Sequence, residues 1–238
     1  MCAIYAFMRY CDDISEAEGA SRVSIDRWRE DLNAALAGQY SSNPLWPAFA
    51  DTVKRHAIPH HYFHEMIDGV SSDLESRKIQ TFDELYRYCY QVASVVGLTI
   101  IHIFGFSSPE ALKLAEQCGI AFQLTNILRD VREDQENRRI YIPAEDIQRF
   151  QADLGKRDER FVTLMAFEAA RAHDYYEKSR PLIGLVEARS RASLWALIEI
   201  YRRLLERIER SQFDVLSKRI RVPTWEKLAI LARAKFVR

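Results

Sequence analysis

Glycine and proline are scarce in this sequence of 238 residues, which contains 8 Gly and 7 Pro. Alternating runs of β-branched residues are also few, so the usual signs of a strand-rich fold are absent. A net charge is missing too, because 34 basic residues balance 34 acidic ones. Proteins that bind nucleic acid normally show a basic excess, so no nucleic-acid partner is expected. An anionic ligand would have to be recognised by local charge.

Cysteine and long apolar runs are equally limited. The sequence has four cysteines, at Cys2, Cys11, Cys89 and Cys118. None belongs to a CxxC pair, which argues against a zinc site or a disulfide framework and fits a reducing cytoplasm. Cys11 and Cys89 lie in apolar helical patterns and are expected in the core. No signal peptide is visible, and the most apolar run, 92–104, is too short to cross a bilayer.

Apolar residues recur at intervals of three to four along most of the chain, which predicts an all-α fold with one domain spanning residues 1–238. A capping box is indicated where Thr81 precedes Glu84, and Ser108 followed by Pro109 is typical of a helix start. Breaks are expected at proline-containing segments. The predicted helices span 2–17, 22–37, 44–57, 60–72, 81–105, 108–135, 143–150, 158–187, 190–211 and 223–236.

The first predicted helix carries an acidic face. Asp12 and Glu16 are four residues apart and share one side of the helix, and Tyr5 and Arg9 continue the same stripe towards the N-terminus. Two like charges at this spacing destabilise a helix slightly unless something binds them. A divalent cation held by these carboxylates is one interpretation, with Arg9 on a phosphate oxygen. The other is a solvated acidic face.

A second acidic face emerges from an apolar helix further along. Asn126, Asp130 and Asp134 recur at intervals of four, and Gln123 lies one turn earlier on nearly the same side. Carboxylate and amide oxygens suit Mg²⁺ or Mn²⁺ and not zinc. Charged groups beside a core are costly unless they are paired or bound to metal. A metal site is therefore predicted here, and an ion-paired helix end is the alternative.

Four segments resemble one known family, the squalene and phytoene synthases. YAFMRYCDDISE (5–16) is similar to the family's first aspartate-rich motif, and AFQLTNILRDVREDQENRRIYIP (121–143) is similar to the second, nearly position for position. YCYQVASVVG (88–97) resembles the YCxxVAGxVG helix, and YRRLLERIERSQFDVLSKRIRV (201–222) resembles the C-terminal part of bacterial members. The second motif is specific, whereas the first alone would not be. The resemblance covers most of the chain.

The resemblance implies an isoprenoid-synthase helical bundle around a central apolar cavity, with Mg²⁺ as cofactor and Mn²⁺ as the alternative. It implies metal ligands at Asp12, Glu16, Asn126, Asp130 and Asp134. It implies diphosphate contacts at Arg9, Arg129 and Arg139. It places Tyr5, Tyr90, Gln123 and Tyr141 around the reacting centre.

Three departures from the family pattern stand out. Glu16 replaces the usual aspartate and reaches farther. Ser94 replaces the glycine of the VAG sequence, at a point where the helix is expected to kink. The family's leading helix, with its Ser-rich phosphate-contacting turn, has no counterpart before Met1, so the domain is expected to lack it.

The implied activity is a Mg²⁺-dependent head-to-head (C1–C1′) condensation of two prenyl diphosphates. The first interpretation is farnesyl diphosphate converted to squalene or its presqualene or dehydrosqualene intermediate, with NADPH required only for squalene. The alternatives are a phytoene synthase using geranylgeranyl diphosphate, a non-catalytic assembly or binding protein of the same fold, and an unrelated helical scaffold. A monomer or weak dimer in the cytoplasm is expected, with peripheral association at the inner membrane face left open.

Two further groups of polar residues have simpler interpretations. His60, His61 and His64 lie together but lack the glutamate of an HExxH motif, so solvated or core histidines are favoured over a metal site. Asp68 and Asp73 are placed to support the site from a neighbouring helix, but a surface pair is favoured.

Overall fold

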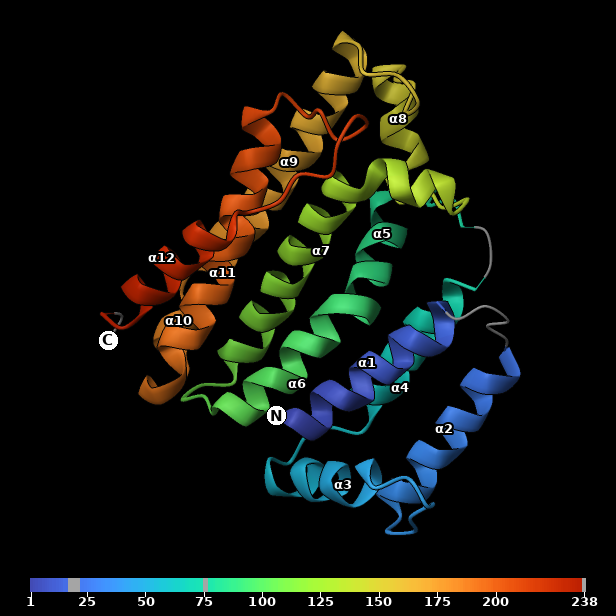
Figure 1. Cartoon of the computed structure of the whole chain (residues 1–238), viewed down its shortest axis with the longest axis vertical. Coiled ribbons are helices and arrows are strands. Elements are labelled where there is room, and N and C mark those ends of the chain that lie inside the picture. The colour runs from blue at the N-terminus through green and yellow to red at the C-terminus, as the bar shows by residue number, and fades with distance from the viewer. Residues whose placement is uncertain (17–21, 75–76, 237–238) are drawn as a thin grey trace.

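The structure is a computed structural model that describes residues 1–16, 22–74 and 77–236, apart from the side chains of Asp12, Ser15 and Glu16. Within these ranges the chain forms helices and no strand, which confirms the predicted all-α class (Figure 1). The helices are α1 (Cys2–Glu16), α2 (Arg22–Leu36), α3 (Leu45–Arg55), α4 (His61–Ser72), α5 (Phe82–Cys89), the π-helix η1 (Tyr90–Ser94), α6 (Val95–Phe104), α7 (Glu110–Glu136), α8 (Ala144–Phe150), α9 (Glu159–Ser179), α10 (Leu182–Leu185), α11 (Ala188–Arg210) and α12 (Thr224–Ala234).

Helix α7 runs through the middle of the molecule (Figure 1). It packs most extensively against α9 and also contacts η1, α6, α5 and α11. Its buried residues lie on several sides of the helix, among them Leu114, Cys118, Ile120 and Leu124. A helix that is apolar over most of its circumference is buried by its neighbours, which explains why α7 forms the centre of the core.

The predicted helix over 81–105 is interrupted by the π-helix η1. Ser94 lies at its end, and the Ser94 hydroxyl donates to the backbone carbonyl of Glu116 on α7 at 2.8 Å. A Cβ built on Gly119 would lie 2.5 Å from the Ser94 Cα, so the two backbones pass closer than any side chain allows. Where a kink was expected, the structure has a π-helix, a feature often found at functional sites.

The predicted helix over 158–187 is wrong at its C-terminal end. α9 stops at Ser179, and the short α10 begins only at Leu182. Pro181 lies between them, and proline has no backbone N–H to donate within a helix interior. The proline was present in the sequence, but the apolar periodicity continues across it and obscured the break.

An aromatic cluster holds α1 against α2, α3 and α4. Phe7 lies 5.5 Å from the Trp28 ring, 4.8 Å from Phe49 and 5.4 Å from Phe63, centroid to centroid. Trp28 also donates its Nε1–H to the Cys11 sulfur at 3.1 Å. Cys11 is buried as predicted, and Cys89 is buried in α5. These contacts fix which face of α1 turns towards the rest of the molecule.

Candidate active site

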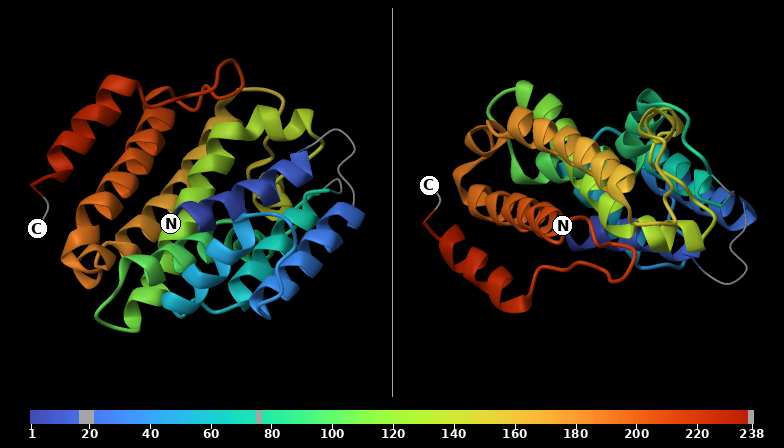
Figure 2. Two further views of the ribbon diagram at one scale, coloured as in Figure 1. Left: turned by 60° about the horizontal axis from the view of Figure 1, so that its bottom comes forward. Right: turned by 90° about the horizontal axis from the view of Figure 1, so that it is seen from above.

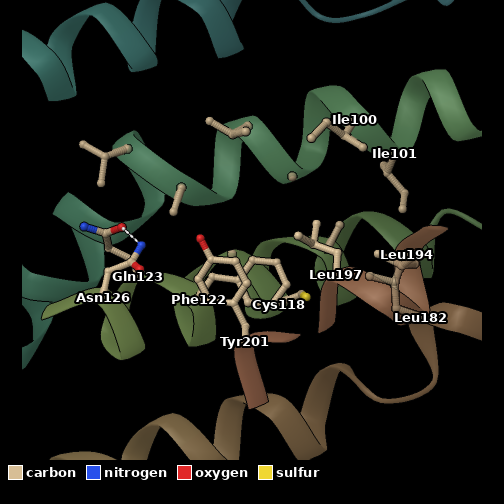
Figure 3. Close-up of a pocket in the computed structure, with 16 residues that line it drawn as sticks. Ile100, Ile101, Cys118, Phe122, Gln123, Asn126, Leu182, Leu194, Leu197 and Tyr201 are labelled. Atoms are coloured by element: carbon tan, nitrogen blue, oxygen red, sulfur yellow. Dashed lines mark hydrogen bonds between the residues drawn. The ribbon is translucent and has the colours of Figure 1, made fainter. Parts of the chain in front are cut away.

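Two adjoining cavities lie between α7, the α5–η1–α6 segment and α11, and α1 and α4 also line the larger one. The larger has a volume of about 1020 Å³ and the smaller about 240 Å³. Polar and charged side chains line part of the larger cavity, whereas the smaller one is mainly apolar (Figure 3). The residues that line both cavities are Val92, Val96, Ile100, Gln123, Asn126 and Tyr201. Because six residues line both, the two cavities adjoin, and together they are called the channel, with a polar and an apolar end.

One wall of the channel is a stripe of side chains at intervals of four. Tyr88, Val92, Val96 and Ile100 follow one another from the polar part of the larger cavity towards the apolar end. The stripe passes through η1, where the wider turn lets α7 approach closely on the Gly119 side.

The opposite wall is the polar face of α7, as the spacing predicted. Gln123, Asn126, Arg129 and Asp130 all line the larger cavity. The Asn126 side-chain nitrogen Nδ2 donates to the Gln123 side-chain oxygen Oε1 at 3.3 Å (Figure 3). The Asn126 side-chain oxygen Oδ1 is buried and has no hydrogen-bond partner. A buried acceptor without a partner is costly, so this oxygen is a candidate ligand atom.

Asp130 lies between two arginines. Arg129 donates its Nε–H to Asp130 at 2.7 Å. Arg219, from the segment between α11 and α12, lies 3.1 Å from Asp130 and 2.7 Å from Glu133. Arg219 was not among the predicted site residues, because no helical spacing relates it to α7. Arg129 and Arg219 therefore bring two positive charges to the polar end of the channel.

Asp134 lies one turn beyond Asp130. Burial, followed by the negative charge of Asp130, raises the pKa of Asp134 to about 7. It lines a very small void with Arg139 and Tyr141 instead of the main channel. The Arg139 guanidinium donates to the backbone carbonyl of Asp73 at 2.7 Å, so it ties the segment after α7 to the end of α4.

Asp73 is a site residue that the sequence pattern did not favour. It lines the larger cavity, where the Tyr88 hydroxyl donates to it at 3.0 Å and the Tyr141 hydroxyl at 2.8 Å. The two tyrosine rings stack 4.6 Å apart. Burial raises the pKa of Asp73 despite these bonds. The expected surface pair is therefore wrong for Asp73, whereas Asp68 does lie outside and pairs with Arg29 at 2.6 Å.

Helix α1 contributes to the entrance of the larger cavity. Tyr5 and Arg9 both line it, as their stripe predicted, although Tyr5 is 67% exposed. Arg9 forms an ion pair with Asp13 at 2.7 Å. The side chains of Asp12 and Glu16 lie outside the described residues, so their role as metal ligands stays a prediction.

Tyr90 does not line either cavity. It lies two residues after Tyr88, and side chains two apart in a helix point to different sides. Burial and then the charge of Glu116 raise the pKa of Tyr90. The tyrosine that faces the channel from this segment is Tyr88. A second aromatic residue that the motifs missed is Tyr201, which lines both cavities and stacks on Phe122 at 4.2 Å.

The donor set at the polar end suits a hard divalent cation. Among the residues with described side chains, no three His, Cys, Asp or Glu side chains converge on one point. However, the unpartnered Asn126 oxygen lies one turn from Asp130, and Asp130 one turn from Asp134. Mg²⁺ in proteins is usually held by one or two carboxylates together with water and substrate phosphates. Asn126 and Asp130 therefore fit Mg²⁺ bound jointly with an anionic substrate, whereas Asp134 lines the separate small void.

Comparisons with known proteins point to one family. The family model of squalene/phytoene synthase matches residues 1–226. A phytoene synthase from Arthrospira platensis is 37% identical over 254 residues, covering 98% of this chain and 82% of that protein. A phytoene synthase from Mycobacterium bovis is 37% identical over 245 residues, covering 98% and 80%.

Solved structures show the same fold. A dehydrosqualene synthase in complex with ligand superposes with a TM-score of 0.91 at 28% identity, covering 98% of this chain and 84% of that one. A squalene synthase from Alicyclobacillus acidocaldarius superposes with a TM-score of 0.83 at 27% identity, covering 89% of this chain and 82% of that one. The fold and the site thus define an all-helical prenyltransferase. The chain belongs to the squalene/phytoene synthase family.

Proposed function

We propose that this enzyme is a Mg²⁺-dependent phytoene synthase that joins two molecules of geranylgeranyl diphosphate head to head. The curated relatives named above are phytoene synthases, which favours this alternative over the farnesyl-based interpretation. Dehydrosqualene formation from farnesyl diphosphate is the second candidate, because a dehydrosqualene synthase is the structural neighbour with a TM-score of 0.91.

The observation that carries the proposal is the single channel with two chemically different ends. Asn126, Arg129 and Asp130 surround its polar end. Ile101, Leu182 and Leu194 lie at its apolar end. A prenyl diphosphate has the same asymmetry, with a charged head and a long hydrocarbon tail. The tail gains by leaving water, at about 0.8 kcal/mol per buried CH₂ group.

The polar end would bind the diphosphate. Arg129 and Arg9 line it, and guanidinium groups match phosphate oxygens in charge and geometry. Asn126 and Asp130 would hold Mg²⁺ from α7, and Asp12 and Glu16 from α1. Asp134, which lines the separate small void, would join them only if its side chain turned towards the channel. When bound, Mg²⁺ would neutralise the diphosphate and stabilise it as a leaving group.

The apolar end would protect the reacting carbon chain. Loss of diphosphate from one substrate leaves an allylic cation. The double bond of the second substrate attacks it, and loss of a proton closes the ring to form a cyclopropyl diphosphate. A second ionisation, rearrangement and loss of a proton would give phytoene, with no reductant consumed. Val92, Val96 and Ile100 exclude water from these cations. Phe122 and Tyr201 present aromatic faces, each worth roughly 0.5–2 kcal/mol to a nearby cation.

Product analysis tests the proposal directly. The enzyme is incubated with Mg²⁺ and either geranylgeranyl or farnesyl diphosphate, with and without NADPH, and the hydrocarbon products are identified. Phytoene formed from the C20 substrate without NADPH is the expected result. Dehydrosqualene from the C15 substrate, with no C20 product, would favour the second candidate. Release of prenyl alcohol alone from both substrates would contradict head-to-head condensation.

A further inference from the structure

Helix α12 is attached to the molecule by one face only. Ile230 and Ala234 are buried against Ala196 of α11. Glu226 lies on the flank of this face, where it forms an ion pair with Arg203 at 2.9 Å. Both views in Figure 2 show α12 on the outside of α11, at the edge of the bundle. The helix therefore has a free outer face.

That outer face is strongly apolar. Trp225 is 68% exposed, Leu228 61% and Leu231 50%, and Phe236, in the turn after the helix, is 84% exposed. At 100° per residue, Trp225 and Leu228 lie on the side of α12 away from Ile230, and Leu231 lies on the flank next to them. Scattered exposed apolar residues are ordinary, but a contiguous group that includes Trp and Phe marks an interaction surface.

The charges around this outer face are of one sign. Lys227, Arg233 and Lys235 are exposed on or just after α12, and Lys218 and Arg221 are exposed in the segment before it. The one acidic residue in 218–236 is Glu226, which is engaged with arginines of α11. A helix with Trp, Leu and Phe on one side and basic residues beside them is typical of segments that lie in a membrane interface.

We propose that the outer face of α12 docks the enzyme onto an anionic lipid surface. Trp225, Leu228 and Phe236 would enter the boundary between headgroups and acyl chains, and the lysines and arginines would contact anionic headgroups. A second copy of this chain is a poorer partner, because an isologous contact would bring the same basic residues together. None of the helices in the described ranges is long and apolar enough to span a bilayer. The contact is thus peripheral.

The position of α12 gives such docking a use, although this part of the argument rests on the proposed function. Ala196 of α11 contacts α12, and the next residue, Leu197, lines the smaller cavity and is partly exposed. The apolar end of the channel therefore borders the helix that carries α12. Docking through α12 would hold this end of the channel near the lipid, into which a hydrocarbon product partitions.

Vesicle flotation tests the docking without relying on catalysis. The full chain is mixed with vesicles of phosphatidylcholine alone or with phosphatidylglycerol, at low and high salt. We expect flotation with the anionic vesicles, reduced at high salt because surface charges are screened. In the double variant Trp225→Ser/Leu228→Ser, the fraction of protein bound to vesicles should fall about tenfold, because two side chains no longer bury apolar area in the lipid. Val23→Ser, at a site that is 76% exposed on α2, is the matched control.

Several outcomes would overturn the proposal. These are flotation of the double variant equal to that of the wild type, absence of wild-type flotation with both kinds of vesicle, and equal binding to neutral and anionic vesicles. A wild-type dimer in sedimentation that the double variant abolishes, without vesicle binding, would assign the surface to a second copy instead. Circular dichroism confirms that the variants fold. An enzyme that floats but makes no phytoene would refute the proposed function alone.

Discussion

Asp73 connects three parts of the chain around the polar end of the channel. It caps the end of α4, and it accepts hydrogen bonds from Tyr88 on α5 and from Tyr141 after α7. Burial raises the pKa of this carboxyl and, together with the Asp73 charge, that of the Tyr141 hydroxyl. Asp73 therefore positions the wall of the cavity on which Tyr88 lies.

Replacing Asp73 should impair catalysis more than replacing Asp68, which lies earlier on α4. In Asp73→Asn the side chain keeps one carbonyl oxygen, so one tyrosine hydroxyl loses its acceptor at a cost of roughly 1–3 kcal/mol. We expect kcat/KM for prenyl diphosphate to fall by about tenfold or more, equivalent to at least about 1.4 kcal/mol. Asp68→Asn, which removes an exposed charge, is the control and should retain near-wild-type kinetics. Equal kinetics for both variants would remove Asp73 from the site.

Glu168 makes stability depend on pH. It is buried with Asp146, and Arg171 lies between the two carboxylates, 2.8 Å and 3.0 Å away. Burial is the main cause that raises the pKa of Glu168 to about 8, and Asp146 adds to it. The folded protein therefore keeps a proton that the unfolded chain releases from about pH 4.5 upwards. The resulting stability is complete below that pH and is lost as pH rises towards 8.

The variant Glu168→Gln should remove this dependence. Denaturant unfolding measured from pH 5 to 8 is expected to show a shallower fall in the free energy of unfolding than in the wild type. The difference in slope is at most about 1.4 kcal/mol per pH unit, the limit for one proton. Parallel curves for the two proteins would show that Glu168 is already ionised across this range.

At the scale of elements, the close contact between α7 and η1 sets the geometry of the channel wall. In Gly119→Ala the new Cβ would meet the Ser94 backbone at 2.5 Å, and backbone cannot turn aside as a side chain can. We expect the free energy of unfolding to drop by roughly 1–3 kcal/mol. Gly184→Ala, in α10 with no atom within 4 Å, is the control and should be neutral or slightly stabilising. If Gly119→Ala left the free energy of unfolding unchanged, η1 would have to shift easily to make room for the added Cβ.

The polar face of α7 should respond to ligand as a unit. Mg²⁺ with inorganic diphosphate is expected to raise the Tm of the wild type, because a ligand that binds only the folded state stabilises it. Asn126→Ala and Asp130→Ala should lose most of this shift, and Asp130→Ala should also abolish turnover while leaving helicity intact. The control is Asp83→Ala, on an exposed position of α5 outside the cavities. An undiminished Tm shift in Asp130→Ala would exclude this carboxylate from ligand binding.

At the scale of the whole molecule, the length of the channel should govern the choice of substrate. Leu194 lies at the apolar end, and Leu194→Trp would shorten the space for a tail. We expect the ratio of C20 to C15 turnover to fall by about tenfold, since overfilling a packed site costs roughly 1–3 kcal/mol. Leu231→Trp, on the exposed face of α12, is the matched control. An unchanged ratio would show that the tail does not reach Leu194.

Much of the fold followed from local pattern. The helices start and end near the predicted positions because capping and apolar spacing are local properties, as the Thr81 cap shows by accepting a bond from the Glu84 N–H. The polar face of α7 was predicted for the same reason. Tyr90 was predicted in place of Tyr88, because the side of the α5–η1 segment that faces α7 is set by packing against residues far away in sequence, such as Gly119.

The sequence by itself determined an all-helical chain and the polar stripe Asn126–Asp130–Asp134, because spacing on one helix fixes which side chains share a face. The resemblance of its motifs pointed to the family. Only the tertiary structure decided that Asp73 and Arg219 join that stripe, that one channel runs from it to the leucines of α10 and α11, and that α12 leaves an apolar face uncovered. These features depend on contacts between residues distant in the chain, which no local pattern records.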